Sequence, residues 1–147
     1  DIASGNVMLT EDLAHIELLD IENLYQPHAP APKYASRGTP GYQHRALGRQ
    51  GQWCPTGDRF AGAILLAEML SWWDPAVRAA TPEGAESLFQ PFELQEDGGA
   101  RWQAMRDAIW ALCPPALALF DAAWSSAALD ACPELATWAW VLLESQQ

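Results

Sequence analysis

The chain has 147 residues, of which half are hydrophobic and 18% are charged, as is ordinary for one globular domain with a hydrophobic core. Nineteen acidic residues outnumber eight Lys and Arg, which gives a net charge of −11, and such a surface repels the phosphates of nucleic acid. No run of about 18 apolar residues is present, as a membrane-spanning helix would need. We therefore expect neither nucleic acid nor membrane insertion among the partners.

Two short apolar segments open the chain. Residues 7–10 and 16–19 have the composition of β-strands and predict a hairpin. Short side chains with oxygen donors flank it, since Asp1 and Asn6 precede the first segment and Asp20 follows the second. A hairpin would bring Asn6 and Asp20 together at its open end.

A long loop is predicted over residues 26–57, which contain five of the eleven prolines and five of the ten glycines. No apolar periodicity runs through this segment. A loop of this length in a compact domain is usually functional or disordered. It contains the sequence Gly-Thr-Pro-Gly-Tyr, residues 38–42.

Helices are predicted for most of the remaining chain. Asp58 could cap a helix over 60–73 that is apolar on every face and therefore buried, and Asp74-Pro75 would end it. Residues 76–99 have a mixed composition and end in a loop signal, Glu96-Asp-Gly-Gly99. Periodic apolar residues and prolines predict three further helices, one over 100–113, one that begins at Pro115 and one that begins near Pro133.

Tryptophan and cysteine add expectations about the core. Most of the eight tryptophans should be buried, the Trp72–Trp73 pair included, because Trp buries a large apolar area. Cys54, Cys113 and Cys132 are odd in number and widely spaced, so neither a zinc site nor a disulfide framework is indicated. Reduced thiols in the core are expected, as in a cytoplasmic protein.

The order and spacing of the polar residues resemble the C-terminal lobe of the protein kinase family. Asp1 and Asn6, five positions apart, resemble the catalytic loop, and Asp20 resembles the Asp that binds magnesium after an apolar strand. Residues 38–42 resemble the segment that receives the protein substrate. Asp58 resembles the Asp that opens the long buried helix and supports the backbone of the catalytic loop.

This resemblance implies a mainly α fold, a protein kinase-like C-terminal lobe over residues 1–147. A catalytic loop and metal-binding hairpin would occupy 1–25, an activation-type and substrate loop 26–57, and a helical subdomain of four to five helices 58–147. The ATP-binding N-terminal lobe would lie outside this chain, so the chain alone would be inactive.

The activity implied is transfer of the ATP γ-phosphoryl group to a Ser or Thr hydroxyl of a protein. Asp1 would orient and deprotonate the acceptor hydroxyl. Asn6 and Asp20 would hold Mg²⁺ with ATP, because Mg²⁺ prefers oxygen ligands and takes few from the protein. Thr39 would hydrogen-bond Asp1, and the substrate loop would include Thr39, Gly41 and Tyr42.

Several departures from the family pattern keep alternatives open. Ala3 stands where Ser/Thr kinases carry a Lys that contacts the transferred phosphoryl, and residues 20–22 read Asp-Ile-Glu in place of Asp-Phe-Gly. Ala46 and Cys132 stand where a Glu and its partner Arg would form a buried ion pair. These changes suggest a divergent bacterial-type branch. One alternative is a pseudokinase that acts as a binding or scaffold module, and a second is a small-molecule kinase, although residues 38–42 argue against the latter.

Overall fold

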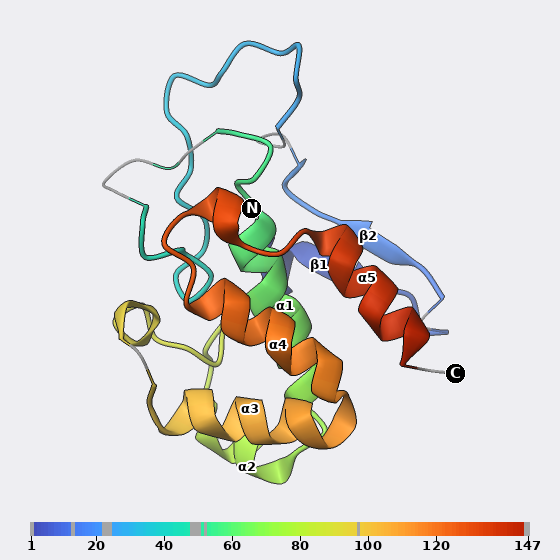
Figure 1. The fold of residues 1–147 in the computed structure, drawn as a ribbon. Helices are drawn as coiled ribbons and strands as arrows, with labels where there is room; N and C mark the ends of the chain where they lie inside the picture. The colour runs from blue at the N-terminus through green and yellow to red at the C-terminus, as the bar shows by residue number, and fades with distance from the viewer. Residues whose placement is uncertain are drawn as a thin grey trace.

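The computed structural model describes residues 2–12, 14–21, 25–47, 51, 53–96 and 98–145. Over these ranges the fold is mainly helical, with five α-helices and one two-stranded antiparallel sheet (Figure 1). No helix within the same ranges combines the length and the apolar character needed to cross a membrane. The prediction of a mainly α domain with a short hairpin is confirmed.

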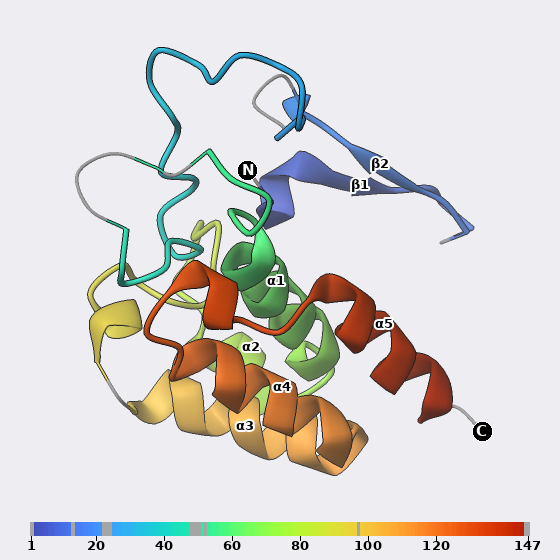
Figure 2. The ribbon, with the colours of Figure 1, turned by 45° about the horizontal axis from the view of Figure 1, so that its top comes forward.

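The hairpin consists of β1 (Val7–Leu9) and β2 (Ile16–Leu18), paired with Val7 opposite Leu18. A 3₁₀ turn, η1 (Ser4–Asn6), leads into it. It lies beside the helices at the same end of the molecule as the long loop (Figure 2). The hairpin leaves a group of large apolar side chains exposed, namely Met8, Leu9, Ile16, Leu18, Leu19 and Ile21.

The first long helix, α1 (Arg59–Ser71), is the most buried element. Seven of its residues are buried, against four in α4, because it is apolar on almost every face. Its C-terminal half is less enclosed, since Met69 is 51% exposed. Asp58 occupies the N-cap position, but its side chain makes no capping hydrogen bond, so the predicted cap is wrong.

A short helix, α2 (Pro75–Ala80), follows where no helix was expected. Asp74 caps it, because its carboxylate accepts the backbone N–H of Ala76 at 2.7 Å, and Pro75 is the first helical residue. Asp74 and Pro75 thus start a second helix directly after the first one ends. The sequence prediction took this pair only as the end of a helix.

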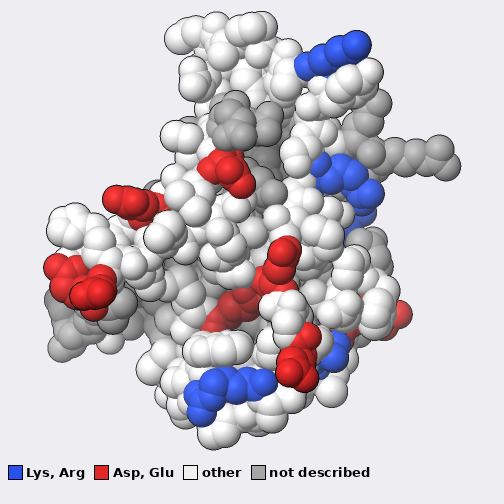
Figure 3. All heavy atoms as spheres, turned by 180° about the vertical axis from the view of Figure 1, so that it is seen from behind, with Lys and Arg blue, Asp and Glu red and all other residues white. Residues whose placement is uncertain are grey.

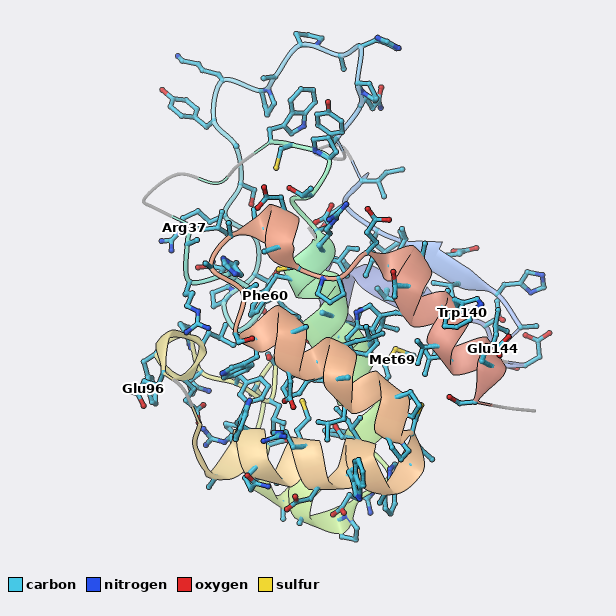
Figure 4. The ribbon with its side chains drawn as sticks, viewed as in Figure 1. Arg37, Phe60, Met69, Glu96, Trp140 and Glu144 are labelled. Atoms are coloured by element: carbon cyan, nitrogen blue, oxygen red, sulfur yellow. The ribbon has the colours of Figure 1, made fainter. Side chains whose placement is uncertain are left out.

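The three predicted C-terminal helices are present as α3 (Ala100–Leu112), α4 (Pro114–Trp124) and α5 (Leu135–Glu144). Each packs against α1 or against another helix that does, so α1 is the centre of the bundle. Two short 3₁₀ turns, η3 (Glu93–Gln95) and η4 (Leu129–Ala131), lie in the connections. Trp140 lies on the outer side of α5 (Figure 4).

The tryptophan prediction is wrong. Only Trp124 and Trp138 are fully buried, whereas Trp72, Trp73, Trp110 and Trp140 are exposed. The number of tryptophans in a sequence does not reveal which face of a helix is covered, and these four lie at helix ends or on outer faces. The cysteine prediction is confirmed in that all three thiols are free, with Cys113 and Cys132 buried and Cys54 partly buried.

The long loop predicted over 26–57 is also confirmed for the part that the structure describes, which forms neither an α-helix nor a strand. The loop lies at the N-terminal end of α1, and α2 and α3 lie at the other end (Figure 1). Tyr42 and His44 are buried, whereas Tyr34 is 72% exposed. The loop is therefore anchored to the core by its second half.

Candidate functional site

The hairpin brings Asn6 and Asp20 to one small hollow. Asn6 directly precedes β1, and its carbonyl accepts the backbone N–H of Leu19 at 2.8 Å, one residue before Asp20. Asn6 and Asp20 line the hollow together with Ile2, Leu18, Leu19, Ile21 and Asp58. The hairpin therefore brings Asn6 and Asp20 to the lining of the same hollow, whereas Asp1, which was expected to join them, lies outside the described residues.

Asp20 has an unusual backbone conformation. Its φ of 52° lies in the left-handed region, and no other non-glycine residue of the described ranges has a positive φ. This conformation is disfavoured for residues with a Cβ, although Asp and Asn tolerate it best. Such conformations cluster at functional sites, where the surrounding structure holds them in place. The chain thus turns sharply at the carboxylate predicted to bind metal.

Of the other residues predicted around the catalytic loop, the structure describes Ala3 but neither Asp1, the predicted base, nor Glu22. Ala3 is only 2% exposed and belongs to the hydrophobic core. A lysine at this position would have to displace core side chains, so position 3 packs the loop onto the core.

The substrate-loop residues form a tight turn. The backbone N–H of Tyr42 donates to the carbonyl of Thr39 at 3.1 Å, and Gly41 has a φ of 92°. A Cβ added to Gly41 would lie 2.5 Å from Cβ of Ser87 and 2.8 Å from the carbonyl oxygen of Phe89. Gly41 is therefore required both by its backbone and by the close approach of the loop after α2. The predicted hydrogen bond from Thr39 to Asp1 lies outside the described residues.

Glu68 anchors this turn, and no sequence motif pointed to it. The Tyr42 hydroxyl donates to Oε2 of Glu68 at 2.5 Å and also lies 3.1 Å from the carbonyl of Glu86. The other oxygen, Oε1, accepts the Ser87 hydroxyl at 2.8 Å and the backbone N–H of Leu88 at 2.7 Å. The signal that could have revealed it is a single acidic residue within an otherwise apolar, buried helix, because such residues are rarely buried without partners.

Burial shapes the electrostatics of this cluster. Desolvation raises the pKa of Glu68, and the hydrogen bonds from Tyr42, Leu88 and Ser87 oppose that shift. Burial, followed by the neighbouring Glu68 carboxylate, raises the pKa of Tyr42 well above its usual range. Tyr42 is therefore a neutral hydrogen-bond donor to Glu68 at physiological pH.

Ser4 links the catalytic-loop segment to the same cluster. Its hydroxyl donates to the carbonyl of Glu86 at 2.6 Å, the acceptor that also faces the Tyr42 hydroxyl. Ser4 begins η1, the turn that ends at Asn6. The predicted metal ligands and the predicted substrate loop are thus connected through one turn of backbone.

Asp58 lies between the start of α1 and the hairpin. It precedes the first turn of α1 and lines the hollow beside Ile2 and Asn6. Its backbone carbonyl accepts the N–H of Gly62 at 2.8 Å, the first intrahelical bond of α1. The position therefore joins the start of the central helix to the hairpin.

A second buried polar cluster ties the loop to the C-terminal part of the chain. Nε2 of His44 lies 2.9 Å from the Ser126 hydroxyl, which in turn lies 3.1 Å from Sγ of Cys132. Nδ1 of His44 accepts the backbone N–H of Ala46 at 3.0 Å, so Nε2 carries the proton in the neutral ring. Burial lowers the pKa of His44. Cys132 stands where the kinase pattern would have the Arg of a buried ion pair. Here it belongs instead to a neutral chain of hydrogen bonds, through Ser126, that reaches His44 in the loop.

The donor set at the hollow suits a metal that shares its coordination with other ligands. Within the described ranges, no three His, Cys, Asp or Glu side chains gather into a metal site made by the protein alone. Asp20 and Asn6 offer a carboxylate and a carboxamide, short oxygen donors of the kind that Mg²⁺ accepts beside phosphate and water, and Asp58 adds a second carboxylate to the lining of the hollow. No family model, no curated protein and no solved structure matches this chain, so its resemblance to protein kinases rests on its own residues.

Proposed function

We propose that this chain is the C-terminal lobe of a protein kinase-like phosphotransferase that moves the γ-phosphoryl group of ATP to a Ser or Thr hydroxyl of a protein. The observation that carries the proposal is the convergence of Asn6 and Asp20 on one hollow, with Asp20 held in a left-handed conformation. Asp20 is exposed, so its carboxylate is not needed there for packing.

Asn6 and Asp20 would hold Mg²⁺ with ATP, and the bound ion would neutralise charge on the phosphates. Asp20 provides the negative charge, and the hairpin fixes its distance from Asn6. The bond from Leu19 N–H to the carbonyl of Asn6 keeps the two ends of the hairpin in register. The site thus depends on the hairpin's pairing as much as on the two side chains.

The acceptor protein would lie against the turn at Thr39–Tyr42. The contact of Tyr42 with Glu68 and the close packing of Gly41 make this turn rigid, as the positioning of a hydroxyl for in-line transfer requires. Asp1 would be the base that orients and deprotonates the hydroxyl. The adenine pocket would require a further lobe.

A scaffold function is the second candidate, and Ala3 favours it. Its side chain is buried in the core, so position 3 offers no cation to the transferred phosphoryl. A scaffold would keep the fold and the rigid substrate turn without turnover. The two candidates differ in whether magnesium-dependent phosphorylation depends on Asp20.

The test is Asp20→Asn in a protein that contains this chain and its ATP-binding lobe. Asn tolerates the left-handed conformation, so the change removes charge while keeping the backbone. We expect loss of magnesium-dependent phosphorylation of a protein substrate by at least about a hundredfold, with unchanged thermal stability. Glu17→Gln is the control, because it also removes one negative charge, from an exposed side chain on β2, and it should keep full activity. Equal activity of Asp20→Asn and wild type would reject the catalytic role.

A further inference from the structure

His44 is the buried side chain that holds the end of the long loop. It is 1% exposed and packs edge-on against the ring of Phe60 in α1, with ring centroids 4.9 Å apart. It lies two residues after Tyr42. Its carbonyl accepts the backbone N–H of Leu47 at 3.0 Å, and Nδ1 of its ring accepts that of Ala46, also at 3.0 Å. The end of the loop is thus folded around this one side chain.

The hydrogen bonds around the ring leave one position for each proton. The Ser126 hydroxyl donates its single proton to the carbonyl of Ala123 at 2.6 Å. Its oxygen therefore accepts the proton of Nε2 of His44, which lies 2.9 Å away. Nδ1 then carries no proton and is free to accept from Ala46. The ring is therefore neutral, with one tautomer, and both of its nitrogens are bonded.

A second proton on this ring would meet a donor and not an acceptor. It would bind at Nδ1, toward which the N–H of Ala46 points, so the two N–H groups would oppose each other and the bond between them would be lost. Turning the ring over restores no acceptor, because both nitrogens of an imidazolium carry protons. A buried N–H without an acceptor is costly, so the protonated ring does not fit this site.

The groups that surround His44 do not compensate a positive charge. Arg45 beside it is itself cationic, and its guanidinium donates to the carbonyl of Trp124. Burial raises the pKa of the Cys132 thiol, which therefore stays neutral. Asp58 is the one carboxylate among the described residues that line the cavity of about 60 Å³ beside His44, but both ring nitrogens are already bonded. The other ionisable groups on the elements packed here are Tyr25, Arg37, Tyr42 and Cys54 of the cavity lining, Arg59 of α1 and Asp130 of η4.

The loop that contains His44 is positively charged, unlike the rest of the chain. Residues 26–57 include four Lys and Arg and no Asp or Glu. The projecting part of the loop, at the top of Figure 3, accordingly shows Lys or Arg, whereas carboxylates lie on the body below it. Burial, followed by the charge of Arg45, lowers the pKa of His44. A proton therefore binds this ring more readily when the loop has left the core than when it is packed there.

We propose that His44 is an acid-sensitive latch for residues 43–47, closed by the neutral ring and opened when Nδ1 is protonated. Opening breaks the bond to Ala46 and withdraws the ring from Ser126, while the contact of Tyr42 with Glu68 remains. The turn at 39–42 then keeps one of its two anchors. The latch goes beyond the proposed function, because it requires neither ATP nor phosphoryl transfer.

The first test follows the ring itself by long-range ¹H–¹⁵N NMR of the histidine nitrogens between pH 7.5 and 4.5. Loss of one set of signals in His44→Gln assigns that set to His44. We expect the pattern of a ring protonated at Nε2 alone, and we expect this neutral pattern to persist below about pH 6.5, where an ordinary His is half protonated. A ring protonated at Nδ1 alone, or a ring already charged at pH 7, would overturn the latch.

The second test follows the loop by amide hydrogen exchange, expressed as protection factors. At pH 5 a His of ordinary pKa is roughly thirtyfold more protonated than neutral, which sets the upper limit of the effect. We expect the protection of Ala46 and Leu47 to fall by about tenfold or more between pH 7 and 5. At pH 5 their exchange should also depend less on low urea concentrations than that of Ile64 in α1, because local opening exposes little surface. Exchange of all three amides with the same urea dependence at pH 5 would show that no separate latch exists.

Two variants assign the effect to one ring. His44→Gln retains a donor and an acceptor but does not titrate, so its own protection of Ala46 and Leu47 should change by less than about threefold between pH 7 and 5. His28→Gln removes an exposed His from the same loop and should keep the full wild-type change. A full change in His44→Gln, or its loss in His28→Gln, would overturn the inference. None of these measurements involves phosphorylation, so the latch and the proposed function can fail separately.

Discussion

Replacing Tyr42 with Phe tests the cluster that anchors the turn at residues 39–42. The substitution keeps the buried ring and removes only the hydroxyl that donates to Oε2 of Glu68 at 2.5 Å. A hydrogen bond to a charged group contributes roughly 1.5–3 kcal/mol, and its loss leaves a desolvated carboxylate oxygen without its donor. Glu68 keeps the donors on its other oxygen, so we expect Tyr42→Phe to lower the free energy of unfolding by about 2 kcal/mol near pH 7.

The cost should depend on pH, because the pKa of Glu68 is raised in the folded protein. A carboxyl group of this kind stabilises the fold fully below its unfolded pKa, and the contribution is lost as the pH rises through the folded pKa. Tyr42 opposes the rise, so Tyr42→Phe raises the pKa of Glu68 further. The deficit relative to wild type should therefore shrink toward about 1 kcal/mol near pH 4.5, where only a neutral hydrogen bond is lost.

Urea unfolding of wild type, Tyr42→Phe, Glu68→Gln and the double variant at both pH values gives the required double-mutant cycle. Differences between variants at one pH cancel the titration of all other groups. We expect a coupling energy between Tyr42 and Glu68 of at least about 1 kcal/mol near pH 7. A coupling below about 0.5 kcal/mol, or a deficit that is the same at both pH values, would refute the role assigned to this contact.

Three further predictions concern the loop and the core. Gly41→Ala should cost about 2–4 kcal/mol in urea unfolding, whereas Gly84→Ala, with a positive φ but open space, should cost about 1 kcal/mol; equal costs would show that close packing plays no part. Burial lowers the pKa of His44, so the neutral ring stabilises the fold fully above the unfolded pKa, and this contribution is lost as the pH falls below about 6.5. His44→Gln should therefore make the free energy of unfolding depend less on pH between about pH 6.5 and 5. Ile64→Ala should cost about 2–5 kcal/mol, and Met69→Ala less than about 1 kcal/mol, as their exposed fractions of 0% and 51% require.

The sequence patterns that predicted the fold correctly were periodic or compositional. The alternation of short apolar segments located the hairpin, and the apolar run over 60–73 located α1 within two residues at either end. These patterns succeed because burial on one face of a strand or on all faces of a helix leaves a regular trace in the sequence. The same reasoning placed Asn6 and Asp20 together, since the ends of a hairpin must meet.

The features that remained hidden depend on contacts between distant segments. Glu68 is twenty-six residues from Tyr42 and nineteen from Ser87, and no local pattern links the three. Asp74 was recognised as the end of one helix, but its capping of α2 depends on the turn that the chain makes there. Exposure of Trp72 could not be inferred from composition, because it depends on which elements pack at the end of α1.

The central helix explains how the two halves of the proposed site keep their spacing. Asp58, at the N-terminal end of α1, lines the hollow of Asn6 and Asp20, whereas Glu68, ten residues further along, holds the turn at residues 39–42 through Tyr42. Ten residues of α-helix span about 15 Å, and α1 is the most buried element of the fold. Both polar anchors thus project from one rigid body, and the Ser4 hydroxyl closes the connection by joining the hairpin side to the loop that faces Glu68. A site assembled from a hairpin, a long loop and a distant turn can in this way keep a fixed geometry, even though none of these segments has much regular structure of its own.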